Sequence, residues 1–541
     1  MKETIEKLIN TGLKELGIDE PKKFNIEHPT NLDFGDYSSN VGIVTGKGQE
    51  IADWLGQNLP KEIEKVEVKA GFINFYLSKE FFAESLETII EEGEKFGRSD
   101  RLKGEKVMVE YTDPNPFKEF HIGHLMSNSI GETVSRIFDW NGAEVKRACY
   151  QGDVGLHVAK AIWGALKNNE SGIKNNEWGK FYTMGSKAYE EDEDAKKEII
   201  EINKKIYEKS DNEINKLYEQ GKKESLEYFD AIYKKLGTKF DYFIMESEAA
   251  PVGEKIVREN VGKIFEESDG AIVFHAEKYD PKLHTRVFIN SEGLPTYEAK
   301  DLGNAKLKSE LYPYTRSVVI TGNEVTDYFK VMLAAMKLVL PKLAEETKHL
   351  PHGMLRLPTG KMSSRTGDVI TAESLIEEVK KIIGEKGQEA TDDIAVGAIK
   401  YTILKQGIGN DIIFDFDKSI STEGDSGPYL QYTYARTNSL LEKAHPSPKA
   451  SEWQVGERVR TIEKLLYRFP EVVERAGAEY APQHITTYLI ELASAFNNFY
   501  AHEQVISDDL ETPYRLAIVK ATNIIMKNGL NILGIPTPER I

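Results

Sequence analysis

One stretch of the sequence decides the fold: Pro114-Asn-Pro-Phe-Lys-Glu-Phe-His121-Ile-Gly-His124. It follows an apolar run at 107–112 that is typical of a β-strand, and it opens an amphipathic run at 125–140 that is typical of a helix. Two histidines three residues apart lie on one side of a first helical turn. A helix N-terminus attracts phosphate, and imidazoles there can donate hydrogen bonds to a phosphoryl group that gains charge in a transition state. The stretch therefore predicts a strand–helix junction that binds a nucleotide, with Gly123 leaving room for a flat base.

A central region, residues 105–385, surrounds this junction. Strand-like runs alternate with helix-like runs, and this alternation predicts a parallel sheet with crossover helices. The expected strands are 107–112, 144–150, 285–290, 317–321 and 354–357. The segment at about 160–265 is rich in lysine and glutamate at helical spacing, and we interpret it as a solvated helical insertion without a part in the chemistry.

Two further domains flank the central region. Residues 1–100 predict a small α/β domain, with helices at 3–16 and 49–59 and strands at 65–69 and 72–77. Residues 386–541 are helical throughout, which predicts an all-α bundle. Its expected helices are 393–405, 429–444, 457–469, 484–502 and 513–533.

Composition limits the class of protein. The formal net charge of −18 argues against nonspecific coating of nucleic acid, but it leaves room for specific binding through local basic patches. The single cysteine, Cys149, excludes an intrachain disulfide, fits a reducing cytoplasm and argues against a structural zinc site. No apolar run reaches the length of a membrane span, and the polar N-terminus does not read as a secretory signal. We therefore expect a cytoplasmic protein without a membrane partner.

A second motif lies about 240 residues downstream of the histidines: Gly360-Lys-Met-Ser-Ser-Arg-Thr-Gly367. Its cations, Lys361 and Arg365, can neutralise the β- and γ-phosphates of ATP. Taken alone, a solvated basic turn explains the motif as well. The sequence holds neither a Walker-type P-loop nor a G-x-G-x-x-G that opens a helix, which argues against P-loop, nicotinamide and flavin enzymes.

Together the two motifs resemble the HIGH and KMSKS signatures of class I aminoacyl-tRNA synthetases. The resemblance implies that His121, His124 and Lys361 act in catalysis. It also implies an ATP site with Gly123, Lys118, Met362, Ser363 and Arg365. One position departs from the family pattern, because the second lysine of the signature is Ser364. Arg365 or Lys118 is then the candidate for the missing cation.

Several collinear stretches resemble arginyl-tRNA synthetases in particular. They lie at 35–40, 71–75, 109–115, 150–155, 236–241, 246–247, 293–301, 427–436 and 527–541, and so span nearly the whole chain. This resemblance implies that Tyr297 and Asp301 bind the arginine side chain. It also places Asn115, Glu110 and Asp113 near the backbone end of the substrate, with Glu324 as a further candidate in the turn after the strand at 317–321.

The chemistry of arginine agrees with this assignment. Tyr297 and Asp301 are four residues apart and share a helical face, although without the surrounding motifs an ordinary solvated pair would explain them. A carboxylate pairs bidentately with a planar guanidinium, which lysine cannot imitate. Such a pocket rejects other amino acids by leaving its charge unpaired, so no editing domain is required, and none is evident in the sequence.

The helical C-terminal region carries aromatic and amide side chains that suit unpaired RNA bases. We expect Tyr429, Tyr432, Asn498 and Tyr500 to contact tRNA, because aromatic rings stack on bases while amides bind their edges. Most other tyrosines of the region are explained as core. The family resemblance assigns this domain to the anticodon loop and the N-terminal domain to the corner of the tRNA.

The resemblance therefore implies an arginine–tRNA ligase with L-arginine, ATP as its Mg²⁺ complex, and tRNA(Arg) as substrates. We expect no tightly bound cofactor, no zinc and a monomer, and the family further implies that arginine activation requires bound tRNA. Two alternatives stay open. One is a class I synthetase for another amino acid, chiefly cysteine, although the cysteine ligands for its zinc are lacking. The other is a non-catalytic RNA-binding relative.

Overall fold

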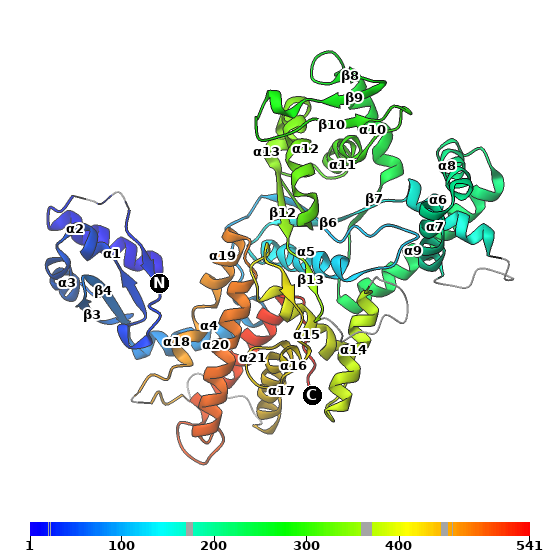
Figure 1. Cartoon of the computed structure of the whole chain (residues 1–541). Helices are drawn as coiled ribbons and strands as arrows, with labels where there is room; N and C mark the ends of the chain where they lie inside the picture. The colour runs from blue at the N-terminus through cyan, green and yellow to red at the C-terminus, as the bar shows by residue number, and fades with distance from the viewer. Residues whose placement is uncertain (20, 22, 169–176, 359–369, 445–452, 457) are drawn as a thin grey trace.

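A five-stranded parallel sheet lies at the centre of this computed structural model, which describes residues 1–19, 21, 23–168, 177–358, 370–444, 453–456 and 458–541 (Figure 1). The strand order is β12-β11-β5-β6-β7. The strands are β5 (Lys106–Glu110), β6 (Glu144–Gln151), β7 (Tyr242–Met245), β11 (Arg316–Gly322) and β12 (Thr347–His352). The chain moves outward from β5 to β7 and then returns to β11 on the other side of β5. This reversal makes a topological switch point, where ligands bind at the carboxyl ends of the strands.

Helices cover both faces of the sheet. Helix α5 (Ile122–Trp140) packs on the face to which Val107, Val318 and Ile320 point, in the largest apolar core. Helices α10 (Glu246–Glu259), α11 (Tyr297–Leu311) and α12 (Thr326–Val339) lie on the other face, where Val319 points. Alternate residues of β11 therefore enter opposite cores, as the two-residue period of a strand requires. The predicted α/β class with a parallel sheet is confirmed.

Two of the five expected strands do not belong to this sheet. Residues 285–290 contain β10 (Arg286–Ile289), which pairs antiparallel with β9 (Ala271–Phe274) in a separate sheet that also holds β8 (Glu266–Ser268). Residues 354–357 contain β13 (Leu355–Arg356), which pairs with β14 (Ile412–Ile413). Their places are taken by the edge strands β7 and β12. Strand β12 is polar and contains Pro351, which an edge strand tolerates because one side needs no donor.

The lysine- and glutamate-rich segment is helical as expected. It forms α6 (Leu156–Lys167), α7 (Trp178–Glu191), α8 (Glu193–Glu208) and α9 (Asn212–Leu236), which project to one side in Figure 1. These helices have an apolar core of their own, which includes Ile162, Phe181 and Ile199. Strand β7 and helix α10, which follow α9, belong to the central fold. The insertion therefore ends before β7, whereas the sequence predicted an end at about 265.

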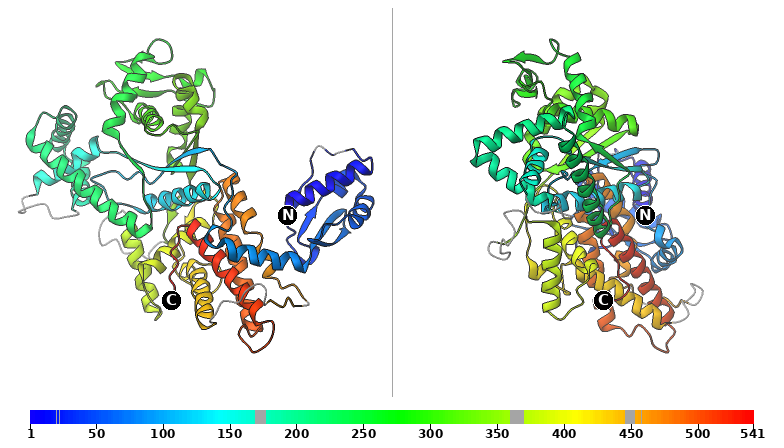
Figure 2. Two further views of the ribbon diagram at one scale, coloured as in Figure 1. Left: turned by 180° about the vertical axis from the view of Figure 1, so that it is seen from behind. Right: turned by 90° about the vertical axis from the view of Figure 1, so that its right-hand side faces the viewer.

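The N-terminal domain stands apart from the central sheet, as the left view of Figure 2 shows. Its antiparallel sheet has the order β1-β2-β4-β3. The elements are α1 (Lys2–Glu15), β1 (Ile26–Glu27), β2 (Tyr37–Ser39), α2 (Val41–Thr45), α3 (Gly48–Gln57), β3 (Ile63–Lys69) and β4 (Phe72–Leu77). Helix α4 (Lys79–Glu92) joins this domain to the rest of the molecule and packs against α21 (Thr512–Ile532).

The C-terminal part is the expected helical bundle. Its elements are α14 (Ala372–Glu385), α15 (Asp392–Leu404), α16 (Phe416–Ser419), α17 (Gly427–Lys443), α18 (Glu463–Leu466), α19 (Phe469–Glu479), α20 (Gln483–His502) and α21. The single helix expected at 457–469 is wrong. Helix α18 is only one turn long. A separate helix, α19, begins at Phe469 and has Pro470 in its first turn, where proline is tolerated. The bundle is linked to α12 through α13 (Pro341–Glu346), β12 and β13. Among the described residues, no helix is both long and apolar enough to cross a membrane.

Candidate active site

The two histidines cap the first turn of α5. His121 is the N-cap residue, and its Nδ1 accepts a hydrogen bond of 3.1 Å from the backbone N–H of Gly123. The Nδ1 of His124 accepts a hydrogen bond of 3.2 Å from the backbone N–H of His121. Because each Nδ1 is an acceptor, each neutral ring carries its proton on Nε2. Two N–H donors are thereby left for a ligand at the carboxyl end of β5.

The surroundings keep both rings neutral. Burial lowers the pKa of His121, and the positive charge of Lys118 lowers it further. Burial also lowers the pKa of His124 well below its usual value, with smaller contributions from His121 and Lys118. Lys118 therefore lies close enough to act on both imidazoles, and its Nζ lies 4.9 Å from the ring centre of Tyr182 on α7.

The structure explains why position 123 is a glycine, for a reason that the sequence did not reveal. A Cβ at this position would lie 2.8 Å from Cε1 and 2.9 Å from Nδ1 of His121, closer than such contacts occur. Any side chain here would therefore displace the ring that caps the helix. The absence of a side chain keeps the His121 imidazole folded over the first turn.

The second motif lies outside the described residues, with Lys361, Met362, Ser363, Ser364 and Arg365 all in the gap at 359–369. The chain beyond the gap reaches the histidine motif directly. Ile122 donates its N–H to the carbonyl of Ile370 at 3.0 Å, and Ala372 donates to the carbonyl of Phe120 at 2.9 Å. The segment that follows the motif is therefore hydrogen-bonded to the residues on either side of His121.

A set of buried ion pairs lies at the carboxyl ends of β5 and β7. Glu110 accepts from Lys308 at 2.7 Å and from the amide of Asn304 at 2.9 Å. Glu246 pairs with Lys300 at 3.0 Å. Each of these carboxylates thus has its own cation, as burial requires.

Asp301 differs from these carboxylates. Among the described residues, none forms a hydrogen bond or ion pair with its side chain. Burial raises the pKa of Asp301 well above its usual value, and the negative charges of Glu110 and Glu246 raise it further. Asp301 therefore belongs to a cluster of carboxylates in which it has no cation of its own among the described residues.

Three other residues expected around the amino acid, Tyr297, Asn115 and Asp113, each have their own surroundings. Tyr297 begins α11 and is 64% exposed at the rim, with Lys300 Nζ 5.2 Å from its ring centre. Asn115 packs against Gly152, where a Cβ would lie 2.2 Å from its Oδ1. Asp113 accepts from the backbone N–H of Tyr150 at 2.8 Å.

Glu110 and Glu324 lie in different surroundings. The carboxylate of Glu110 is held by Lys308 and Asn304 in the protein interior. Glu324 is exposed, and its charge acts on His121 and His352, so it lies on the histidine side of the site.

The helical insertion contacts the loops around the site through α9. Asp153, directly after β6, accepts from Lys222 at 2.7 Å and from Tyr218 at 2.8 Å, both on α9. The hydroxyl of Ser225 on α9 accepts from the backbone N–H of Phe117 at 2.9 Å. Phe117 has a φ of +68°, a strained conformation for a bulky residue. Helix α9 thus holds the loop that carries Lys118.

Comparisons with known proteins agree with this architecture. A family model for the catalytic domain of "tRNA synthetases class I (R)" matches residues 85–416. Models for the "Arginyl tRNA synthetase N terminal domain" and the "DALR anticodon binding domain" match residues 3–77 and 430–541. The arginine–tRNA ligase of Halothermothrix orenii is 30% identical over 566 aligned residues, covering 100% of this chain and 99% of the relative. The chain belongs to the arginyl-tRNA synthetase family.

Other relatives extend the comparison. The arginine–tRNA ligase of Clostridium kluyveri is 32% identical and covers 95% of this chain and 96% of its own. The solved arginyl-tRNA synthetase of Thermus thermophilus has a TM-score of 0.80 at 23% identity, with full coverage of both chains. That of Plasmodium falciparum has a TM-score of 0.79 at 20% identity and covers 100% of this chain and 99% of its own. The structural likeness establishes a common fold for the family member described here.

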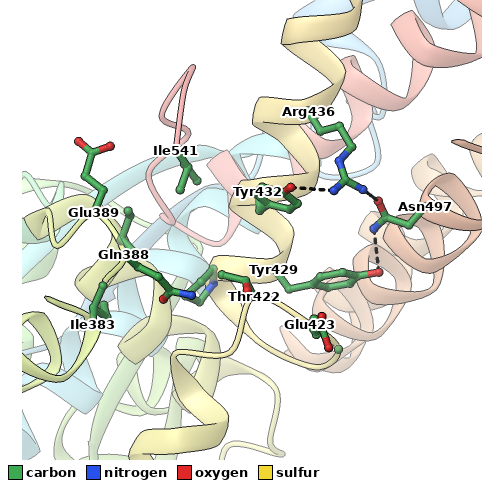
Figure 3. Close-up of a pocket in the computed structure, with 13 residues that line it drawn as sticks. Ile383, Gln388, Glu389, Thr422, Glu423, Tyr429, Tyr432, Arg436, Asn497 and Ile541 are labelled. Atoms are coloured by element: carbon green, nitrogen blue, oxygen red, sulfur yellow. Dashed lines mark hydrogen bonds between the residues drawn. The ribbon is translucent and has the colours of Figure 1, made fainter. Parts of the chain in front are cut away.

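A hollow of about 630 Å³ lies in the helical bundle (Figure 3). Tyr429 and Tyr432 of α17 line it, together with Arg436 and Asn497. Arg436 donates to the Asn497 amide oxygen at 2.6 Å and to the Tyr432 hydroxyl at 2.8 Å. The Asn497 amide nitrogen in turn donates to the Tyr429 hydroxyl at 2.9 Å. These bonds hold the two tyrosine rings in place beside an open cavity.

The other two residues expected to contact tRNA, Tyr500 and Asn498, lie beside different cavities. The ring centre of Tyr500 lies 5.3 Å from the Arg436 guanidinium, next to the cavity. Asn498 instead lines a different hollow, with Phe499 and His502, because consecutive helix residues point about 100° apart. Its neighbour Asn497 lines the cavity that holds Tyr429 and Tyr432.

Sequence reasoning also missed several residues of the cluster around Asp301. Asn304 and Lys308 share the side of α11 that carries Asp301, so their helical spacing was a signal that could have found them. Lys300 precedes Asp301 directly and has no such signal. Tyr150 and Glu246 come from other strands and helices, and no local pattern connects them to Asp301.

Proposed function

We propose that this member of the arginyl-tRNA synthetase family ligates arginine to tRNA(Arg), with ATP consumed to AMP and pyrophosphate. The observation that carries the choice of amino acid is Asp301, a carboxylate without a hydrogen bond or ion pair among the described residues, beside Glu246 and Glu110, which each pair with a lysine. A guanidinium supplies that charge and two parallel N–H donors. In this assignment Tyr297 closes the rim over the side chain, while Asn115 and Asp113 lie nearer the substrate's backbone end.

The first step joins the arginine carboxylate to the α-phosphate of ATP and releases pyrophosphate. His121 and His124 would donate their Nε2–H groups to phosphate oxygens, which gain charge as the bond forms. The positive charge of Lys118 lowers the pKa of both histidines, which supports a position of this cation beside the same phosphates. Lys361 and Arg365 would neutralise the β- and γ-phosphates, with Met362, Ser363 and Gly123 beside the nucleotide. Mg²⁺, when bound with ATP, would add positive charge to the same phosphates.

In the second step the terminal adenosine of tRNA attacks the arginyl-adenylate through a ribose hydroxyl, forming an ester and releasing AMP. Catalysis in both steps is by positioning and charge, without a covalent enzyme intermediate. We assign Tyr429, Tyr432 and Tyr500, with Asn497 in place of Asn498, to contacts with unpaired bases of the anticodon loop. Stacking surfaces beside a fixed amide suit that task.

Further parts of the proposal concern the whole chain. We assign residues 1–100 to contact with the tRNA corner, 105–385 to catalysis and 386–541 to the anticodon. The three family matches follow the same order, at 3–77, 85–416 and 430–541, with the catalytic match extending past residue 385. We also propose a cytoplasmic monomer without zinc or a tightly bound cofactor. Light scattering and metal analysis of the purified protein would test the last two statements.

Charging assays test the central assignment. The purified protein, ATP and tRNA are incubated with each of the twenty amino acids, and esterified tRNA is measured. We expect charging with arginine only, and Lys361→Ala should reduce it by about 100-fold or more at unchanged thermal stability. Charging with another amino acid, or tight tRNA binding without charging, would refute the proposal.

A further inference from the structure

Tyr150 carries a buried hydroxyl for which the described residues provide no hydrogen-bond partner. The residue lies near the carboxyl end of β6, and its backbone N–H is held by Asp113 at 2.8 Å. A buried hydroxyl without a partner costs free energy, and native proteins rarely retain one without a use. The backbone bond fixes the strand at this point, so the position of the ring is set by the sheet.

The charged groups that act most strongly on this hydroxyl are carboxylates. Asp301 acts on it most strongly, followed by Glu246, Glu110 and Asp153. Three of these four are already satisfied: Glu246 by Lys300, Glu110 by Lys308, and Asp153 by Lys222, Tyr218 and Ser247. Asp301 alone has no partner among the described residues.

A third unpartnered atom lies on the same helix as Asp301. The amide oxygen of Asn304 is buried and accepts no hydrogen bond within the described residues, while its nitrogen donates to Glu110. Asn304 follows Asp301 by three positions, so both side chains lie on one side of α11. The cluster therefore gathers acceptors from β6 and α11 for which the described residues provide no donors.

We propose that the Tyr150 hydroxyl is a specificity-determining contact for the substrate's guanidinium. Its oxygen accepts one guanidinium N–H, and its O–H donates to the carboxylate of Asp301. The inference rests on the proposed function, since it names a further residue for the same amino acid. A guanidinium has five N–H donors in one plane, and a single carboxylate satisfies only two of them. A pocket that supplies acceptors for the remaining donors separates arginine from lysine, whose ammonium lacks that planar fork.

Substitution Tyr150→Phe tests the contact because it removes only the hydroxyl. We expect the KM for arginine in tRNA charging to rise about 10- to 100-fold, as for a lost hydrogen bond to a charged group. The KM values for ATP and tRNA should stay within about twofold of those of the parent protein. The melting temperature should stay equal or rise, because the variant loses a buried polar atom that had no partner.

A matched control lies at the other end of the same strand. The Tyr312 hydroxyl donates to the carbonyl of Glu144, where β6 begins, at 3.0 Å. Tyr312→Phe removes a satisfied hydroxyl far from Asp301, so it should leave the arginine KM unchanged while lowering the melting temperature.

A double variant separates contact with substrate from a structural role. If the Tyr150 hydroxyl acts together with Asp301, adding Tyr150→Phe to Asp301→Asn should change the arginine KM by less than in the parent background. An arginine KM for Tyr150→Phe within twofold of the parent value would overturn the inference. So would equal effects in both backgrounds, or KM values for arginine, ATP and tRNA that rise together. A parent protein that charges no arginine would instead refute the proposed function.

Discussion

The imidazole rings of His121 and His124 stack on each other, with their centroids 3.6 Å apart and their planes 20° from parallel. The stack exists because each ring accepts a backbone N–H through Nδ1, His121 from Gly123 and His124 from His121. The same two imidazole rings thus cap the helix and present two Nε2–H donors outward. The same backbone bonds that start α5 fix the tautomer needed for binding phosphate.

The pH profile of arginine activation should therefore lack a histidine titration near 6.5. The pKa values of both rings are lowered by burial, so the donating neutral form persists as the pH falls through that value. Protonation would place an N–H against the backbone N–H groups and break the cap. ATP–pyrophosphate exchange with saturating substrates and tRNA, measured from about pH 5 to 8, checks this. An activity that halves at pH 6.5 or above while the protein stays folded would contradict it.

Asp301→Asn should weaken arginine binding and stabilise the free protein. The pKa of Asp301 is raised by burial and by Glu110, so its charge costs stability at neutral pH, and the cost disappears as the pH falls through the raised pKa. We expect an arginine KM at least about 100-fold higher and an unfolding free energy about 1 kcal/mol higher. Kinetics and denaturant unfolding at neutral and acid pH measure both effects.

Asp153 provides the opposite control. Its carboxylate has four hydrogen bonds, from Lys222, Tyr218 and the backbone and hydroxyl of Ser247, and they lower its pKa despite burial. Asp153→Asn should therefore lower the unfolding free energy, by about 2 kcal/mol or more. Destabilisation by both variants would show that Asp301 is not an unpaired charge.

Lys400 should make stability rise with pH. Its Nζ donates to the carbonyls of Leu236 at 2.6 Å and Gly534 at 2.8 Å, and burial lowers its pKa from 10.5 to about 7. Between these values the unfolded chain binds the proton that the folded one has lost. The contribution to unfolding free energy then grows by up to about 1.4 kcal/mol per pH unit. Urea unfolding at several pH values should show a smaller slope for Lys400→Met; parallel slopes would refute the assignment.

Arg436→Lys should weaken tRNA binding without affecting the small substrates. The Arg436 guanidinium reaches both Asn497 and Tyr432 and lies 4.5 Å from the ring centre of Tyr432, contacts that a single ammonium cannot all replace. We expect the KM for tRNA to rise about tenfold and the KM values for arginine and ATP, at saturating tRNA, to stay unchanged. Arg475→Lys, at an exposed pair with Glu479 on α19, is the control and should change none of them.

Local patterns predicted much of the fold. The strand–helix junction at β5 and α5 and most helices of the bundle follow from apolar spacing and capping residues, which depend on neighbours in sequence. The sheet was predicted less completely. Strand β10 has the local pattern of a strand yet pairs elsewhere, and β12 with Pro351 lacks that pattern yet joins the edge. Pairing partners come from distant parts of the chain, and period-2 alternation does not name them.

The sequence by itself determined the chemistry that this chain carries: the histidine pair at a helix start, the tyrosine and aspartate on one face of α11, and the order of three domains. These features depend on residues within a few turns of one another. Only the tertiary structure decided which carboxylates are paired and which tyrosine faces which acid. Lys300 and Lys308 neutralise Glu246 and Glu110, whereas Asp301 and Tyr150 stay without partners among the described residues. Charge compensation is set by distances across strands and helices, which sequence spacing does not contain.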